Sequence, residues 1–520
     1  MTTAPLPTGT AEGARNRDDL VIGRGPLTIE DVAAVAAGER SVALETSPAF
    51  RAAITAARAV VERGIGGSSA MYGVTTGVGA SVTNDIPPGL RAAMPENLFR
   101  FHGCGTGAIL GEDSAAAVML VRMASLARGY SGVRMELLER MVELLNLRML
   151  PRIPSEGSVG ASGDLTPLSY LAAVIAGERE VTLRGEVMEA AEAHARCRLE
   201  PLALQPKESL ALMNGTAVMT ALSCLAHARA TRLARLASAI TAIMVDVTHG
   251  NPEHFDAELL GVKPHPGQTR CGAWIRADLA RASGGVPIAA RLQDRYSLRC
   301  APHVVGTLLD GLEFGRQVLE IELNGVDDNP IITTGGAVLH GGNFYGGHVC
   351  MVADLLKAQV AGIADLLDRQ LALVCAPETS AGLPANLVAA DEVVHHGFKA
   401  MQISASALTA EALKLTMPAS AFSRSTESHN QDKVSMGTIA ARDLMRVLEL
   451  TETVSAIVLL AGLQAVDLRG PGQCGVRAAE LHGAVRARIP MVIDDRRQDR
   501  DIEGVLDLLR RDEMPIGAVR

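Results

Sequence analysis

The chain has 520 residues, of which 48% are hydrophobic and 21% charged, and its formal net charge at neutral pH is −9. This acidic balance argues against nucleic acid as a partner. The most apolar stretches, near residues 236–247 and 454–466, are too short to span a bilayer, so no membrane association is expected. The eight cysteines include no Cys-x-x-Cys pair, which predicts reduced thiols in a cytoplasmic protein.

Residues 1–20 are rich in Thr, Pro, Gly and Ala and lack an apolar core, which predicts a disordered tail rather than a signal peptide. We expect residues 21–208 to form a globular head. Apolar residues recur there at helical spacing. The predicted helices span 29–37, 49–63, 88–101, 114–127, 134–146 and 165–176, with a Gly-rich loop over 64–79 and a short hairpin over 180–188.

Long helical patterns dominate the rest of the chain, residues 209–520. The predicted helices span 209–247, 304–323, 349–373, 396–415 and 443–466. Several exceed the usual length of a helix in a globular protein, and such helices need other long helices to cover their apolar faces. We therefore expect a mainly α fold, in which the head joins an elongated bundle of long helices that identical subunits complete.

The tripeptide Ala161-Ser162-Gly163 precedes the helix predicted over 165–176. Gly163 has no side chain, so its amide nitrogen can approach the carbonyl carbon of Ala161. Attack there closes a five-membered ring, and loss of water from the ring and from the Ser162 side chain leaves an exocyclic methylidene beside an imidazolone. No ordinary side chain is a comparable carbon electrophile. The simpler alternative, compatible with the first, is a helix start with Ser162 as the N-cap and Asp164 in the first turn.

Several separated motifs accompany this tripeptide. They are Tyr72-Gly-Val-Thr-Thr-Gly-Val-Gly79, Glu96-Asn-Leu98 with Phe101-His102-Gly103, Met213-Asn-Gly-Thr216, Gln293-Asp-Arg-Tyr-Ser-Leu-Arg299, Asp328-Asn-Pro330 and His429-Asn-Gln-Asp432. In this order and combination the chain, from about residue 28 to residue 469, resembles the family of aromatic amino-acid ammonia-lyases and aminomutases. The resemblance implies the ammonia-lyase or aspartase-like fold, a 4-methylidene-imidazol-5-one (MIO) electrophile formed autocatalytically from the tripeptide, and homotetramers whose active sites draw residues from three subunits.

Eliminating ammonia from an amino acid requires an acceptor that activates the amine and a base for a weakly acidic β-proton. The electrophile made from Ala161, Ser162 and Gly163 meets the first need. Tyr72 matches the family's catalytic base, on a Gly-rich loop suited to a mobile lid. Arg299 matches the residue that binds the substrate carboxylate through two parallel hydrogen bonds, and Tyr296 matches one that assists proton transfer. The other residues that match positions contacting the substrate or the ring are Asn214, Gln293, Asn329, Phe344, Glu411 and Gln431.

The histidines do not indicate a metal site. No His-Glu-x-x-His motif is present, and the adjacent His395 and His396 cannot share one face of a helix. His249 and His254 lack a supporting third ligand. We therefore expect neither a metal ion nor a dissociable cofactor.

Phe101 and His102 match the two adjacent residues that contact the substrate's ring in the family. Phenylalanine lyases tend to carry Phe-Leu there, tyrosine lyases His-Leu and histidine lyases Ser-His. Phe101 offers a stacking wall for benzene, whereas His102 could hydrogen-bond a phenol or an imidazole. The sequences of the motifs His429-Asn-Gln-Asp432 and Pro167-Leu-Ser-Tyr170 resemble those of the phenylalanine and tyrosine enzymes more than those of the histidine enzymes.

The expected reaction is thus elimination of ammonia from a small aromatic amino acid, with phenylalanine or tyrosine favoured, to give a trans-arylacrylate such as cinnamate or coumarate. Three alternatives remain open. The first is a histidine ammonia-lyase that gives urocanate. The second is an aromatic 2,3-aminomutase, which uses the same electrophile but returns ammonia to the β-carbon. The third is an inactive helical scaffold, against which the intact tripeptide, Tyr72 and Arg299 argue.

Overall fold

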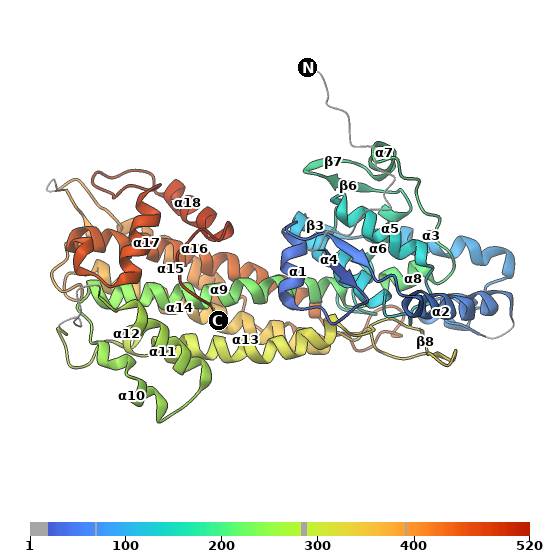
Figure 1. Ribbon diagram of the computed structural model, residues 1–520, viewed down its shortest axis with the longest axis horizontal. Helices are drawn as coiled ribbons and strands as arrows, with labels where there is room; N and C mark the ends of the chain where they lie inside the picture. The colour runs from blue at the N-terminus through green and yellow to red at the C-terminus, as the bar shows by residue number, and fades with distance from the viewer. Residues whose placement is uncertain (1–18, 68–69, 282–288, 391–392, 520) are drawn as a thin grey trace, which may run out of the picture.

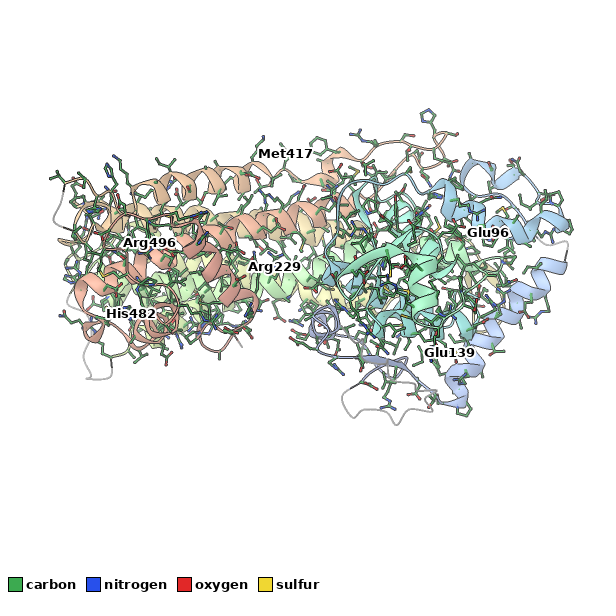
Figure 2. All side chains as sticks on the ribbon, turned by 90° about the horizontal axis from the view of Figure 1, so that it is seen from above. Glu96, Glu139, Arg229, Met417, His482 and Arg496 are labelled. Carbon is green, nitrogen blue, oxygen red and sulfur yellow. The ribbon has the colours of Figure 1, made fainter. Side chains whose placement is uncertain are left out.

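The computed structural model describes residues 19–67, 70–281, 289–390 and 393–519. Figure 1 shows an N-terminal head, from which long helices run side by side to the far end of the molecule. Figure 2 shows the same long axis from above: Glu96 and Glu139 lie in the head, whereas His482 and Arg496 lie at the opposite end. The predicted mainly α fold with an elongated long-helix bundle is confirmed. Residues 1–18 of the expected tail lie outside the described residues, and Leu20 begins the first strand.

The head combines short strands with helices packed on a buried core. Its helices are α1 (Ile29–Ala36), α2 (Pro48–Gly66), α3 (Met94–Phe101), α4 (Glu112–Leu126), α5 (Met135–Asn146), α6 (Leu165–Ile175), α7 (Ala190–Arg196) and α8 (Glu208–Met213). Its strands are β1 (Leu20–Ile22), β2 (Val42–Leu44), β3 (Thr106–Ile109), β4 (Met149–Pro151), β5 (Pro154–Glu156), β6 (Glu180–Leu183) and β7 (Glu186–Glu189). Strand β1 pairs with β2 in parallel, whereas the β3–β5 and β4–β6–β7 sheets are antiparallel. The expected hairpin is β6–β7.

The bundle is built around long helices of 23 to 33 residues, with shorter helices beside them. Its helices are α9 (Ala217–Val247), α10 (Ala257–Gly261), α11 (Pro266–Asp278), α12 (Tyr296–Arg299), α13 (Ala301–Leu323), α14 (Gly347–Cys375), α15 (Lys399–Lys414), α16 (Gly437–Arg469), α17 (Val476–Arg486) and α18 (Asp499–Arg510). A two-stranded β8 (Ile331–Ile332) and β9 (Val338–Leu339) ribbon follows α13. The 3₁₀ turns are η1 (Gly79–Thr83), η2 (Pro88–Ala93), η3 (Pro252–Phe255), η4 (Ala385–Leu387), η5 (Ala419–Phe422) and η6 (Pro471–Gln473).

The single helix predicted over 209–247 is in fact two helices, α8 and α9, with a break at residues 214–216. Gly215 has a φ of 159°, outside the helical region. The backbone N–H of Thr216 donates to the Asp327 carboxylate, 2.7 Å away, rather than to a helical carbonyl. Helical periodicity continues through the break because both helices are buried, so the sequence pattern does not reveal it.

The expected N-cap role of Ser162 is also wrong. Helix α6 begins at Leu165, so Asp164 occupies the cap position, and Ser162 lies outside the helix with a φ of 52°. The carboxylate of Asp164 caps another helix instead. It accepts hydrogen bonds from the backbone N–H groups of Val218 and Met219, at 2.9 and 3.0 Å, in the first turn of α9. Asp164 thereby ties the tripeptide to the break between α8 and α9.

No helix in the described ranges has the length and apolarity needed to cross a membrane. Within the same ranges, no group of three or more His, Cys, Asp and Glu side chains is arranged to hold a metal ion. All eight cysteines are free thiols, and six of them are buried or partly buried in the bundle helices and their connections.

Candidate active site

A cavity of about 400 Å³ opens in the head beside the tripeptide. Six residues predicted for the site line it together: Tyr72, Phe101, His102, Ser162, Asn214 and Gln431. The other lining residues are Gly77, Val78, Gly79, Ser81, Met94, Asn97, Leu98, Leu165, Leu210 and Glu427. Five separate segments of the chain therefore converge on one site. The last of them reaches it after Met417, where the chain runs from the bundle onto the head (Figure 2).

The tripeptide forms a tight turn held against the break between α8 and α9. Ser162 and Gly163 both adopt left-handed conformations, with φ values of 52° and 76°. A Cβ atom on Gly163 would overlap the carbonyl oxygen of Gly215, so only glycine fits there. The same carbonyl accepts the N–H of Asp164 at 2.7 Å. On the cavity side, the Gln431 amide donates to the Ser162 hydroxyl at 3.3 Å.

Asp164, directly after the tripeptide, is fully buried. Burial raises the pKa of its carboxyl group to about 6, although the hydrogen bonds from Thr438, Met219 and Val218 act in the opposite direction. Desolvating a buried carboxylate costs free energy, but its hydrogen bonds hold the donors in fixed directions. It fixes the start of α9 relative to the turn that carries Ser162.

Tyr72 lies on the Gly-rich loop at the cavity wall. Its hydroxyl oxygen accepts the N–H of Gly79 at 2.7 Å, and its own backbone N–H donates to Nε2 of His340 at 3.3 Å. Burial raises the pKa of the phenol, and the nearby negative charge of Glu427 raises it further. The phenol is therefore protonated at neutral pH, and its basic form becomes populated as the pH rises.

Phe101 and His102 stand together at the end of α3, with ring centroids 4.0 Å apart. Nδ1 of His102 lies 2.9 Å from the carbonyl oxygen of Leu98. Because a carbonyl can only accept, Nδ1 must carry the proton. Burial lowers the pKa of His102, so the ring is neutral at pH 7 and its Nε2 carries a lone pair. His102, which lines the cavity, thus carries a hydrogen-bond acceptor at Nε2.

Asn214 is held in place by the loop that follows α13. Its side-chain NH₂ donates to Oδ1 of Asp328 at 3.2 Å and to the backbone carbonyl of Asn329 at 2.9 Å. The other carboxylate oxygen of Asp328 lies 2.5 Å from the buried ammonium of Lys207. Asn329, a predicted site residue, therefore lies next to Asn214, and its own side-chain oxygen accepts the N–H of Gly341.

Three predicted residues do not reach this cavity within one chain. Gln293, Tyr296 and Arg299 lie in or just before α12, which Figure 1 places toward the end of the bundle away from α3 and α8. Tyr296 is 70% exposed, and the guanidinium of Arg299 lies 4.6 Å from its ring centroid. Nε of Arg299 donates to the Asp294 carbonyl. An exposed aromatic ring with a cation on its face is a surface suited to contact with another molecule.

Glu411 and Phe344 also lie outside the cavity lining. Glu411 is on α15, where its exposed carboxylate pairs with the guanidinium of Arg446 at 2.8 Å. Phe344 is half-buried in the loop after β9. A carboxylate does reach the cavity, but it belongs to Glu427.

Glu427 is the main residue that the sequence analysis missed. Its two carboxylate oxygens accept the N–H of Ala80 at 3.0 and 3.1 Å, and they lie against Gly79 in the Tyr72 loop. The segment that carries Gln431 thus also anchors the loop that carries Tyr72. Glu427 stands four residues before Gln431, and the position of an acid so close to a motif residue was the available signal.

Met94, Asn97 and Leu98 were also missed, although helical spacing could have indicated them. They precede Phe101 by seven, four and three residues, so they share its face of α3. Once Phe101 is assigned to the cavity, these three residues follow from the geometry of the helix.

The residues around the tripeptide fit the expected electrophile. The left-handed turn, the glycine at position 163 and the close approach of the Gly215 carbonyl leave the Gly163 nitrogen confined near Ala161. The Ser162 hydroxyl, which would be lost as water, faces the cavity. The side chain that would become electrophilic is therefore open to a substrate, while the backbone that would cyclise is tightly packed.

Comparison with known proteins places the chain in a family. A profile described as aromatic amino acid lyase matches residues 27–487. The histidine ammonia-lyase of Gloeobacter violaceus is 39% identical over 501 residues, covering 95% of this chain and 96% of the relative. The tyrosine aminomutase of Streptomyces globisporus superimposes with a TM-score of 0.88 at 35% identity, covering 95% and 97%. The histidine ammonia-lyase of Trypanosoma cruzi gives a TM-score of 0.86 at 32% identity, covering 95% and 93%.

These comparisons overturn the expectation that phenylalanine or tyrosine is the favoured substrate. Eight curated relatives, 35–39% identical over nearly the whole chain, are all histidine ammonia-lyases. The expectation gave most weight to the sequence of the motif around Gln431, a residue that contacts Ser162 in the structure. It gave less weight to His102, a polar residue that lines the cavity.

The profile match and the relatives both span most of the chain, and one cavity is lined by Ser162 of the tripeptide, by Tyr72 and by the pair Phe101-His102. The chain belongs to the aromatic amino acid lyase family and is a carbon–nitrogen lyase.

Proposed function

We propose that the protein is a histidine ammonia-lyase, which eliminates ammonia from L-histidine to give urocanate. The curated relatives support this substrate. The observation in the structure that supports it best is the protonation state of His102. Its Nε2 lone pair is a partner for the N–H of a neutral imidazole, whereas a phenyl ring would leave it unpaired in a partly buried site, at a cost of about 1–3 kcal/mol.

Each group at the cavity would have a separate role in this reaction. The electrophile, which we propose forms from Ala161, Ser162 and Gly163, would supply the electron sink that makes the amine a better leaving group. Tyr72 would take the β-proton, and its position at the cavity wall, on the loop that Glu427 anchors, supports this role. Phe101 provides an apolar wall beside the imidazole, and His102 accepts its N–H.

A panel of amino acids tests the substrate directly. Purified protein is incubated with L-histidine, L-tyrosine and L-phenylalanine, and the products are separated and identified. We expect urocanate from histidine as the main product. Coumarate or cinnamate formed with a higher kcat/KM than urocanate would contradict the proposal, and accumulation of a β-amino acid would instead identify an aminomutase.

Replacing His102 by Leu should lower kcat/KM for histidine by about 10- to 100-fold, because the imidazole N–H loses its acceptor in a desolvated site. The same variant should improve the ratio of phenylalanine to histidine turnover, since Leu leaves no polar group unpaired. Steady-state kinetics with both substrates provide the measurement. His194, a buried histidine whose Nε2 lies 2.9 Å from the Val174 carbonyl, offers a control outside the cavity. A His194→Leu variant that changed the substrate ratio as much would show that the effect is not local.

We further propose that the protein works as a cytoplasmic homotetramer. The free cysteines suit a reducing compartment. The separation of Arg299 and Tyr296 from the cavity supports assembly, because a substrate carboxylate bound beside Ser162 needs a cation that the same chain holds elsewhere.

Subunit mixing tests this arrangement. Tyr72→Phe and Arg299→Ala chains should each be nearly inactive alone. When they are co-expressed, some sites receive an intact Tyr72 from one chain and an intact Arg299 from another, so activity should return. Light scattering of the sample should report four chains. If mixed assemblies form without any gain in activity, each site draws both residues from one chain and the shared-site proposal fails.

A further inference from the structure

The segment Asn214–Thr216 is wedged between the tripeptide and a buried ion pair. On one side, the carbonyl oxygen of Gly215 packs directly on Gly163. On the other side, a Cβ atom on Gly215 would overlap the guanidinium of Arg122 and approach a carboxylate oxygen of Asp327 to 2.7 Å. Gly215 therefore has no room to move away from the tripeptide unless this ion pair moves.

Arg122 on α4 and Asp327 after α13 form that pair, with an N–O separation of 2.9 Å. Their side chains are 0% and 8% exposed. Oδ1 of Asp327 also accepts the hydroxyl of Ser125 at 2.6 Å. Oδ2 accepts the backbone N–H of Thr216 at 2.7 Å and its hydroxyl at 3.0 Å. Although burial alone would raise the pKa of Asp327, Arg122 and these donors hold it below its usual value.

A buried ion pair adds little net stability, because desolvation of the two charges offsets most of their attraction. Such a pair is better explained by what it positions. Arg122 also donates to the backbone carbonyl of Asn214, at 3.3 Å, so the pair grips residues 214 and 216 on both sides of Gly215. The Asp327 carboxylate accepts from four donors: Arg122 and Ser125 on α4, and the N–H and hydroxyl of Thr216 before α9. Donors on two different elements fix the carboxylate in one orientation.

We propose that Asp327, through Arg122 and Thr216, is a positioning residue for cyclisation of the tripeptide: it clamps Gly215 against Gly163 and so keeps the Gly163 nitrogen on the Ala161 carbonyl carbon. The inference rests on the proposed electrophile. In cyclisation a bond forms between that nitrogen and that carbon. The Ala161 oxygen leaves as water with the amide hydrogens of Ser162 and Gly163. A second water takes the Ser162 hydroxyl and its α-hydrogen, and no oxidant is needed.

The clamp acts by preventing relaxation rather than by chemistry. Attack by an amide nitrogen on a neighbouring carbonyl is slow because the open chain rarely places the two atoms in contact, and a confined geometry raises its rate. Asparagine at position 327 would keep one acceptor oxygen but turn an NH₂ donor toward either Arg122 or Thr216, so one side of the clamp loses its acceptor. The Gly215 carbonyl can then retreat, and the turn at Ser162 and Gly163 can open.

The test follows maturation in time. The full chain is made by cell-free translation, synthesis is stopped, and intact-mass spectra record the fraction that has lost two waters. Asp327→Asn should slow this loss by about 10- to 100-fold, because it removes a hydrogen-bonded charge from a buried pair. Asp278→Asn is the matched control, since Asp278 forms an equally buried pair with Arg235 in the bundle, at 2.7 Å. It should lower thermal stability similarly but leave the rate of water loss unchanged.

The outcomes distinguish a missing electrophile from a missing clamp. If the wild-type chain never loses two waters, the electrophile is wrong and the clamp falls with it. If the wild type matures but Asp327→Asn matures at the same rate, the clamp alone is wrong. Slowing by Asp278→Asn to the same extent would also overturn it, as would normal maturation of Asp327→Asn with loss of activity alone. Should Asp327→Asn not fold, Ser125→Ala removes one donor from Asp327 and should slow maturation by a few fold.

Discussion

Replacing Ser162 by Ala should lower the turnover of histidine by more than about 10⁴-fold. Enzymes accelerate reactions by at least about 10⁶-fold, and no other side chain of the protein can replace the electrophile that Ser162 would form. Alanine has no hydroxyl to lose, so no exocyclic methylidene can form. The fold should persist, since the Ser162 hydroxyl only accepts a long hydrogen bond from Gln431, worth about 1 kcal/mol or less.

Three measurements on the Ser162→Ala protein check this result: steady-state turnover, far-ultraviolet circular dichroism and intact mass. Ser238→Ala is a suitable control, because it removes a buried hydroxyl that bonds only locally within α9 and beside Cys271. That variant should show wild-type turnover and the loss of two waters. Near-normal turnover in Ser162→Ala would defeat the proposed chemistry altogether.

Replacing Tyr72 by Phe should reduce kcat by about 10²- to 10⁴-fold, the usual contribution of a general base. The raised pKa of Tyr72 gives the reaction a pH dependence whose direction is fixed. The basic form of the phenol is scarce at neutral pH and grows as the pH rises toward the pKa. We therefore expect the kcat/KM of the wild-type protein to climb on the alkaline side of neutrality, and the Tyr72→Phe protein to lack that climb.

Glu427→Gln refines the same experiment. The negative charge of Glu427 disfavours the phenolate of Tyr72, so its removal should lower the pKa of the phenol and move the alkaline rise in kcat/KM to lower pH. Gln can keep one acceptor for the Ala80 N–H, so the loop should stay anchored. A pH profile that does not move in Glu427→Gln, or one that survives in Tyr72→Phe, would show that another group titrates.

Helical periodicity was sufficient to predict most of the long helices, since α13, α14 and α16 bury apolar residues along their whole length. It could not predict the break at residues 214–216, because what ends α8 there is a hydrogen bond to Asp327, more than a hundred residues away. Strands β1 and β2, three residues each, were missed because so short a run shows no alternation.

Some motif residues that lie far apart in the sequence meet within one chain. Tyr72, His102, Ser162 and Gln431 come from separate segments, and the structure brings them to one cavity. Burial and tautomer are properties of the folded chain, so the acceptor at Nε2 of His102 could not be derived from the sequence. The substrate expectation rested on the sequences of residues 429–432 and 167–170, which carry no information on which nitrogen of His102 holds a proton, and the histidine ammonia-lyase relatives overturn it.

The distance between Arg299 and the cavity has a consequence for the behaviour of dilute or damaged protein. If a complete site needs several chains, a correctly folded but isolated chain is silent, and activity should vanish on dilution before any helix melts. One defective chain would also inactivate every site to which it contributes a residue in its assembly. A minority of defective chains could therefore abolish the activity of a majority of intact ones.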